Sequence, residues 1–419
     1  MRTSKSALVL VLLLALSSIM APAVAHETGR LDLSRLVVVG DSLSAGFQNG
    51  SLLDAQQIHG YASVVARQAE VSLPLPLIAA PGIPNVLTLV DPGPPPILGV
   101  EPGVSSGRVD PTVQAMNLAV PGHRVQDALT VWPDLDFSTD VMADLVLGFP
   151  GLFLGAARSQ VEWAETLAPT AAIVWLGNND VLGPAVAGNA SLVTPVKDFR
   201  TAYREVLDRV GRTGADLIVA NIPDVTALPY FTSAEKIAAN VGAPLEVIGP
   251  ALGLAAGDYV TPDAFELIGL ILAGAMASPL PGHVVLDAGE VETIRAATRQ
   301  FNYIIASEAL YRRAALVDVH GLFQCAAARG IVAGDRQLTT DFLGGLFSLD
   351  AVHPTRTGYA VLANAFIHAI QLRFDTRIPR VNLAQVAAED PLVLPVTAEP
   401  LDYDPKIRPT CTLWLGWAR

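Results

Sequence analysis

The sequence is poor in charge and has no block of basic residues. Only 16% of its 419 residues are charged and 51% are hydrophobic, which excludes a disordered chain and indicates a globular protein with much buried surface. The 27 lysines and arginines are outnumbered by 40 aspartates and glutamates, so the electrostatic attraction of the chain to a phosphate backbone is weak. We therefore expect no nucleic-acid partner.

Cysteine is almost absent as well. Cys325 and Cys411 are the only two, and in an oxidising compartment they permit a single disulfide. Such a bond would join the C-terminal tail to the domain, whereas two unpaired thiols are the alternative. The chain has no internal repeat, and its 419 residues suffice for one large domain or two ordinary ones.

The first 25 residues have the pattern of a secretory signal peptide. Arg2 and Lys5 precede an apolar run from Ala7 to Leu16, and Ala23-Val24-Ala25 offers small residues for cleavage. The run is shorter than the ~20 apolar residues that a bilayer span needs, and no cysteine follows it to carry a lipid. We expect a mature protein that is exported to the periplasm or the extracellular space.

Short apolar runs alternate with helical patterns along the rest of the chain, which predicts an α/β protein. The expected strands comprise residues 36–39, 113–118, 171–176, 217–220 and 316–319. The expected helices comprise residues 58–70, 197–210, 289–313 and 355–374. We therefore predict a three-layer α/β/α sandwich around a five-stranded parallel sheet.

Three insertions interrupt this alternation. Residues 74–111 are rich in proline and glycine, and we interpret them as an elaborated surface loop near the site, without regular elements. Residues 126–159 form a mostly helical insertion. Residues 226–281 include a helix-start signal at Thr261-Pro262, followed by the almost wholly apolar stretch Phe265 to Met276. A helix of that kind packs in the core or covers a greasy site as a lid.

One domain over residues 26–380, with these insertions, accounts for the pattern. The proline-bearing residues 381–419 are expected to be an irregular tail that packs on the domain through Trp414 and Trp417.

Ser42 is the candidate nucleophile. It follows the first expected strand directly, in Gly40-Asp41-Ser42-Leu43. In parallel sheets covered by helices, chemistry gathers at the carboxyl ends of the strands. Gly-Asp-Ser is also ordinary turn composition, so the position alone does not establish a nucleophile.

Partners for a serine nucleophile occur elsewhere in the chain. His353 is one of only seven histidines and shares a short loop with Asp350, before the last expected helix. Histidine is the usual base for serine, and a carboxylate fixes its tautomer. Gly122 exposes its backbone N–H at a strand end and Asn179 supplies an amide, so both can stabilise an oxyanion. In isolation, each of these residues fits a turn or a helix start equally well.

Together these blocks resemble the GDSL, or SGNH, hydrolase family. The match runs in the family's order through Gly40-Asp41-Ser42-Leu43, Asn117 to Gly122, Gly177-x-Asn179-Asp180 and Asp350-x-x-His353. It covers about residues 35–375 and leaves residues 74–111, residues 226–281 and the tail unexplained.

The resemblance implies a flavodoxin-like fold and ester hydrolysis without cofactor or metal. Ser42 would attack the acyl carbon, His353 would act first as base and then as acid, and Asp350 would orient His353. The oxyanion would be held by the N–H groups of Ser42 and Gly122 and the side chain of Asn179.

The substrate class is expected from composition rather than from motifs. The apolar insertion favours an acyl-lipid ester, hence a lipase or phospholipase, for which a transient contact with a membrane surface would be natural. A carbohydrate O-acetylesterase of the same fold and a secreted, non-catalytic lipid- or carbohydrate-binding module are the alternatives. Nothing in the sequence indicates an obligate protein partner.

A second serine motif competes with Ser42. Gly103-Val104-Ser105-Ser106-Gly107 fits the nucleophile elbow of α/β-hydrolases. An elbow requires a strand before it and a helix after it, whereas Glu101-Pro102 precedes and Asp110-Pro111 follows. We therefore expect Ser105 not to be the nucleophile.

Overall fold

The computed structural model describes residues 31–93, 96–134, 137 and 139–394, and a parallel sheet forms its centre. The strand order in this sheet is β1-β4-β5-β9. The strands are β1 (Leu36–Gly40), β4 (Ala171–Trp175), β5 (Asp216–Ala220) and β9 (Ala315–Val317). Four of the five predicted strands are thereby confirmed.

The fifth prediction, a strand at residues 113–118, is wrong. The segment does lie beside β1, where Asn117 forms a single parallel bridge with Val38. The side chain of Asn117 donates to the carbonyl oxygen of Ser44 (2.8 Å) and accepts from the N–H of Ala119 (3.2 Å). Backbone bonds to β1 involve only Met116, Leu118 and Val120, so residues 113–115 do not pair with β1 and the segment keeps a single bridge.

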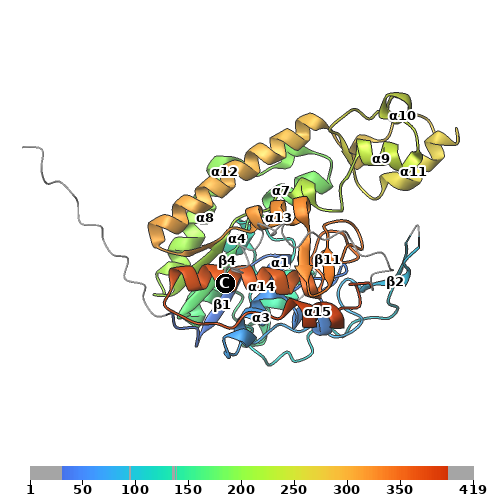
Figure 1. Cartoon of the computed structure of the whole chain (residues 1–419). Coiled ribbons are helices and arrows are strands. Elements are labelled where there is room, and N and C mark those ends of the chain that lie inside the picture. Colours follow the sequence, from blue (N-terminus) through green and yellow to red (C-terminus); the bar gives the residue numbers. More distant parts are fainter. Residues whose placement is uncertain (1–30, 94–95, 135–136, 138, 395–419) are drawn as a thin grey trace, which may run out of the picture.

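Helices cover both faces of the sheet, so the predicted three-layer sandwich is confirmed. Figure 1 shows α8 and α12 on one side of the sheet and α3 and α14 on the other. Their bounds are Tyr61–Gln68 for α3, Val196–Gly211 for α8, Ala288–Arg312 for α12 and Arg356–Arg373 for α14. All four lie where the sequence predicts them.

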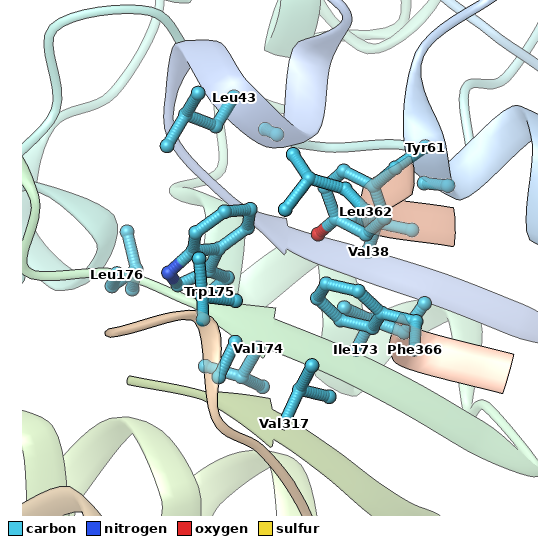
Figure 2. Packing of buried hydrophobic residues seen from close by; sticks show 14 of the residues in the cluster. Val38, Leu43, Tyr61, Ile173, Val174, Trp175, Leu176, Val317, Leu362 and Phe366 are labelled. Carbon is cyan, nitrogen blue, oxygen red and sulfur yellow. The ribbon is translucent and has the colours of Figure 1, made fainter. Parts of the chain in front are cut away.

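The core explains why the central strands are apolar throughout. Every residue of β1 and β4 is buried, as expected for strands covered on both faces. Tyr61 stacks on Phe366 with ring centroids 4.2 Å apart, and Figure 2 shows the two rings side by side against the sheet. Trp175, at the carboxyl end of β4, lies 5.4 Å from the Tyr61 ring and donates to the carbonyl of Asn221 (3.1 Å). These contacts hold the sheet edge that carries the site.

Shorter elements connect and flank the sandwich. The helices are α1 (Ser42–Ala45), α2 (Asp54–Gln57), α4 (Asp127–Thr130), α5 (Val141–Leu147), α6 (Gln160–Leu167), α7 (Asn179–Val186), α13 (Val319–Arg329) and α15 (Leu383–Glu389). The strands β10 (Ile331–Ala333) and β11 (Arg336–Leu338) pair as an antiparallel ribbon. Within the insertion at 126–159, α4, α5 and a 3₁₀ turn at Gly151–Leu154 give short helices, as predicted.

The proline-rich segment 74–111 is more regular than expected. It contains an antiparallel hairpin of β2 (Leu87–Asp91) and β3 (Ile97–Val100), so the prediction of a loop without elements is wrong. The described prolines of the segment lie outside the two strands, where they do not remove a hydrogen bond of the ladder.

The tail is also partly regular, since α15 occupies residues predicted to be irregular. The side chain of Asn382 caps this helix by accepting from the N–H of Gln385 (3.3 Å). Leu383 and Ala387, one turn apart, are both buried. The expected signal peptide, Trp414, Trp417 and Cys411 lie outside the described residues.

The insertion at 226–281 folds into a lobe with its own apolar core. The lobe, residues 232–286, contains α9 (Ala234–Val241), α10 (Leu245–Leu252), α11 (Ala264–Leu272) and the small sheet β6 (Thr232–Ser233), β7 (Tyr259–Val260), β8 (Val285–Leu286). Figure 1 shows it beyond one end of α12.

Helix α11 corresponds to the apolar stretch at 265–276, and of the two expected placements, complete burial in the core does not occur, whereas a lid stays a prediction. Ile268 and Ile271 are buried in the core of the lobe, whereas Phe265 and Leu272 are 48% and 43% exposed. Three helices give too small a core to cover all sides of α11. Among the described residues, no helix is long and apolar enough to cross a membrane.

Candidate active site

Ser42 lies where the first buried strand ends. Strand β1 stops at Gly40, and Ser42 opens the short helix α1, whose N-cap is Asp41. One carboxylate oxygen of Asp41 accepts from the N–H of Leu43 (3.1 Å), which fixes the turn. A Cβ on Gly40 would lie 2.4 Å from Oγ of Ser44, so the close approach of α1 to the end of β1 leaves room only for glycine at residue 40. The strand and turn thus present Ser42 at the carboxyl edge of the sheet.

Asp350 and His353 form a hydrogen-bonded pair. Nδ1 of His353 lies 3.0 Å from Oδ2 of Asp350, and their side chains are only 12% and 13% exposed. Burial acts to raise the pKa of Asp350, but the charge and hydrogen bond of His353 outweigh it and hold that pKa below its usual value. Nε2 of His353 is buried and has no hydrogen-bond partner among the described residues. The pair therefore has an ionised acid, an oriented ring and one nitrogen available for proton transfer.

Phe47 connects this pair to the helix that carries Ser42. Its ring centroid lies 4.7 Å from that of His353, and its backbone N–H donates to the carbonyl of Ser42 (3.1 Å). The hydroxyl of Tyr359, on α14, donates to the carbonyl of Phe47 (2.6 Å). Phe47, anchored by Tyr359, therefore contacts both Ser42 and His353.

The turn that follows Phe47, at Asn49 and Gly50, forms hydrogen bonds with Asp350 and its neighbours. The N–H of Gly50 donates to Oδ2 of Asp350 (2.6 Å), the same oxygen that contacts His353. Asn49 accepts from the N–H of Leu349 (3.0 Å) and donates its own N–H to Oγ of Ser348 (3.0 Å). Segments 300 residues apart in sequence are thus joined beside the nucleophile position.

Gly122 and Asn179, the two predicted oxyanion residues besides Ser42, are also neighbours. Gly122 has φ of 85°, and a Cβ built on it would meet no atom within 4 Å, so this side of the turn is open. Asn179 opens α7, and its side-chain amide donates to the carbonyl of His123 (3.0 Å). The amide of Asn179 has two N–H groups, so one remains for a ligand beside Gly122.

Two buried aspartates brace these loops. Burial raises the pKa of Asp41 to about 6, and the amide of Asn178 donates to its Oδ2 (2.8 Å). Burial likewise raises the pKa of Asp180 to about 6, and its Oδ2 accepts from the N–H of Val125 (2.9 Å). Asp41 and Asp180 are visible in the sequence blocks, but nothing in the sequence reveals their partners.

Sequence reasoning missed a buried chain of polar groups behind the oxyanion loop. Oε1 of Gln160 accepts from the N–H of Gly40 (2.9 Å), and its Nε2 lies 2.9 Å from Nδ1 of His123. Nε2 of His123 lies 3.1 Å from Oδ2 of Asp140. Gln160 and His123 are almost fully buried. The only sequence signal nearby is the capping box formed by Ser159 and Glu162 at the start of α6.

The hydroxyl of Ser105, the competing serine, is engaged in a loop. Its Oγ donates to the carbonyl of Ala79 (2.6 Å). Strand β3 ends at Val100, but it belongs to the β2–β3 hairpin and not to the central sheet, and the next helix, α4, begins only at Asp127, so Ser105 does not lie at a strand-to-helix elbow.

The remaining site predictions concern metals and sulfur. The described residues contain no group of three or more His, Cys, Asp or Glu side chains that could hold a metal ion. Cys325 is half-buried on α13, and Cys411 lies outside the described residues, so the disulfide stays a prediction.

Most of the chain matches the model of one known protein family. The model of the GDSL-like lipase/acylhydrolase family matches residues 36–366, which include all four motif blocks. No curated protein sequence matches the chain.

Solved structures that resemble the chain come from several bacteria. A lipase/acylhydrolase from Enterococcus faecalis is 11% identical and has a TM-score of 0.34, covering 83% of this chain and 100% of its own. An acetyl xylan esterase from Geobacillus stearothermophilus is 12% identical, with a TM-score of 0.37 and coverages of 83% and 99%. An extracellular lipase from Streptomyces rimosus is 13% identical, with a TM-score of 0.34 and coverages of 77% and 94%. Similarities this distant do not distinguish substrates.

Proposed function

Since the chain belongs to the GDSL-like lipase/acylhydrolase family, we propose that its ester hydrolysis uses Ser42 as nucleophile, His353 as base and Asp350 as the residue that orients His353. The observation that carries this proposal is the 3.0 Å contact between Nδ1 of His353 and Oδ2 of Asp350, with Nε2 left unpartnered. A histidine held in this tautomer can accept a proton only at Nε2.

In the first half of the reaction, Oγ of Ser42 bonds to the acyl carbon while its proton moves to Nε2 of His353. The tetrahedral intermediate then expels the alcohol, which takes that proton from His353. In the second half, water gives a proton to His353 and its oxygen attacks the acyl-enzyme. Collapse of the second intermediate releases the acid and returns the proton to Oγ of Ser42.

We further propose that the oxyanion of both intermediates is bound by the N–H groups of Ser42 and Gly122 and by the amide of Asn179. Support comes from the open side of Gly122 and from the bond between Asn179 and the adjacent carbonyl of His123. Each such donor is worth on the order of 100- to 1000-fold in rate.

The substrate that we propose is an acyl-lipid ester. Support comes from the half-exposed apolar side chains of α11, in a lobe that follows a segment adjoining the loop of Asp350 and His353. Hydrolysis of p-nitrophenyl esters from acetate to palmitate tests the proposal, with Ser42→Ala as the blank. Activity that rises with acyl length supports it, whereas a sharp preference for acetate favours a carbohydrate O-acetylesterase.

We also propose that the protein is exported after removal of about 25 residues, as the N-terminal pattern indicates. Intact mass of the secreted protein tests this directly. A mature N-terminus near His26 is expected, and retention of Arg2 and Lys5 in the secreted form contradicts it.

A further inference from the structure

The lobe exposes several large apolar side chains on two of its helices. We define the apolar tip as Val247 on α10 together with Phe265, Leu270 and Leu272 on α11. Their exposed fractions are 66%, 48%, 39% and 43%. Large apolar patches on a protein surface often mark sites of contact with another protein or with lipid.

The exposed residues of α11 follow the geometry of a helix that lies on a surface. Phe265, Gly269 and Leu272 are spaced by four and three residues, so they share one face, and all three are exposed. Ile268 and Ile271, on the flank of this face, are buried and pack in the core of the lobe. After the helix, residues 273–279 continue as small or apolar residues without a single charge. The tip is thus a firmly held apolar surface rather than a loose loop.

The charge around the tip restricts what can cover it. No lysine or arginine occurs between residues 237 and 294. Glu246, Asp263 and Glu266 are the exposed acids of the lobe beside the tip. An anionic membrane attracts proteins through lysine and arginine, so it would gain nothing here and would be repelled by the acids. The complementary partner is an apolar layer whose surface carries no net charge.

The segment that leads into the lobe, and the lobe residue Gly282, both adjoin the elements that carry the site. The N–H of Tyr230 donates to the carbonyl of Ala351, which lies between Asp350 and His353 (3.1 Å). Gly188 packs so closely on the backbone at Gly282 that a Cβ there would lie 2.8 Å from its carbonyl oxygen. Gly188 follows α7, the helix that Asn179 opens. A surface bound by the tip is therefore brought to the side of the molecule where the ester is cut.

We propose that the apolar tip seats on the surface of a neutral lipid layer, zwitterionic or uncharged, and thereby delivers aggregated lipid ester to Ser42. The proposal rests on the proposed function of the site. Helices that bind at such an interface bury an apolar face in the outer part of the layer and need no membrane-spanning segment.

The test measures binding separately from turnover. Mature Ser42→Ala protein, without the signal peptide and unable to consume lipid, is sedimented with phosphatidylcholine vesicles. The double substitution Phe265→Ser and Leu272→Ser in that background is expected to weaken binding at least tenfold. The matched control is Leu310→Ser with Tyr311→Ser, which changes two side chains that are 79% and 81% exposed at the far end of α12. This control is expected to bind like the parent.

Two further arms identify the partner. Vesicles that contain phosphatidylglycerol are expected to bind more weakly than pure phosphatidylcholine, and stronger binding to them contradicts the proposal. A dimer in solution that the tip substitutions dissociate also contradicts it, because a second copy would then be the occupant. Equal loss in the tip and control variants, or no binding by the parent, overturns the proposal.

Turnover distinguishes this proposal from the catalytic one. The tip variant with Ser42 intact is expected to hydrolyse a dissolved short-chain ester at the wild-type rate. If it does so while vesicle binding is unchanged, the docking surface is refuted and the catalytic proposal stands. A wild-type protein that binds vesicles but cleaves no ester would instead refute the catalytic proposal alone.

Discussion

Nε2 of Gln160 lies 2.9 Å from Nδ1 of His123, in the buried interior behind the oxyanion loop. The same amide accepts from the N–H of Gly40, two residues before Ser42. His123 in turn follows Gly122, and its carbonyl binds the amide of Asn179. One glutamine side chain therefore connects the elements that carry all three proposed oxyanion donors.

Replacement of Gln160 by leucine is expected to lower kcat about tenfold, equivalent to ~1.4 kcal/mol, with little change in KM. The substitution removes both buried bonds of Gln160, so the loops of Ser42 and Gly122 are held less precisely. The loss affects the transition state most, because charge develops there on the oxyanion. Steady-state kinetics on a soluble ester measures the split. Gln324→Leu is the control, since Gln324 makes a similar contact with His320 (3.0 Å) on the exposed surface of α13. An unchanged kcat for Gln160→Leu would show that the connection does not position the donors.

Asp350→Asn is expected to reduce kcat by roughly 10⁴-fold while the fold is retained. An amide at this position no longer stabilises the imidazolium and can impose the wrong tautomer on His353. Asp341→Asn serves as control, because Asp341 is an exposed acid that pairs with Lys236 on the lobe (2.9 Å). Loss of less than tenfold in Asp350→Asn would argue against His353 as the base.

Asn179→Ala is expected to lower kcat by about 100- to 1000-fold, the usual effect of removing one oxyanion donor. The comparison is with Asn189→Ala, whose side chain only caps an exposed 3₁₀ turn. Inhibition by a boronic acid that mimics the tetrahedral intermediate should weaken in parallel with kcat. If KM rises instead and kcat is retained, Asn179 binds the substrate rather than the oxyanion.

Asp180 makes the folded state sensitive to pH in a direction that can be measured. Burial raises its pKa from 3.8 to about 6, so the folded protein holds this proton to higher pH than the unfolded chain does. Stability is therefore lost as pH rises from about 4 to about 6, by on the order of 3 kcal/mol for this group. Urea unfolding at pH 4 and pH 7 should show that Asp180→Asn gains stability relative to wild type at the higher pH. Identical changes in the two proteins would contradict the assignment.

The sequence predicts the elements whose signals are local. An apolar run that ends in Gly40-Asp41-Ser42 indicates both a buried strand and a nucleophile, and Asp350 and His353 are close enough in sequence to be recognised as a pair. The strand predicted at 113–118 is reduced to a single bridge, because only Met116, Leu118 and Val120 bond to the backbone of β1. An apolar run does not show how many of its residues will meet a neighbouring strand.

Other features depend on contacts that no local pattern contains. Gln160 and His123 meet only after α6 packs against β1, so neither has a recognisable motif. The apolar composition of α11 likewise fits a buried helix and a surface-seated one equally well, because burial depends on how much of the chain is available to cover it. Exposure of Phe265 and Leu272 is visible only in the folded lobe.

The most direct test of the account is the identity of the serine that reacts. Wild-type protein is treated with a fluorophosphonate, digested and analysed by mass spectrometry, in parallel with Ser42→Ala and Ser105→Ala. We predict one labelled peptide, which contains Ser42, and loss of both label and ester hydrolysis only in Ser42→Ala. Label on Ser105, or full activity in Ser42→Ala, would contradict the proposed mechanism.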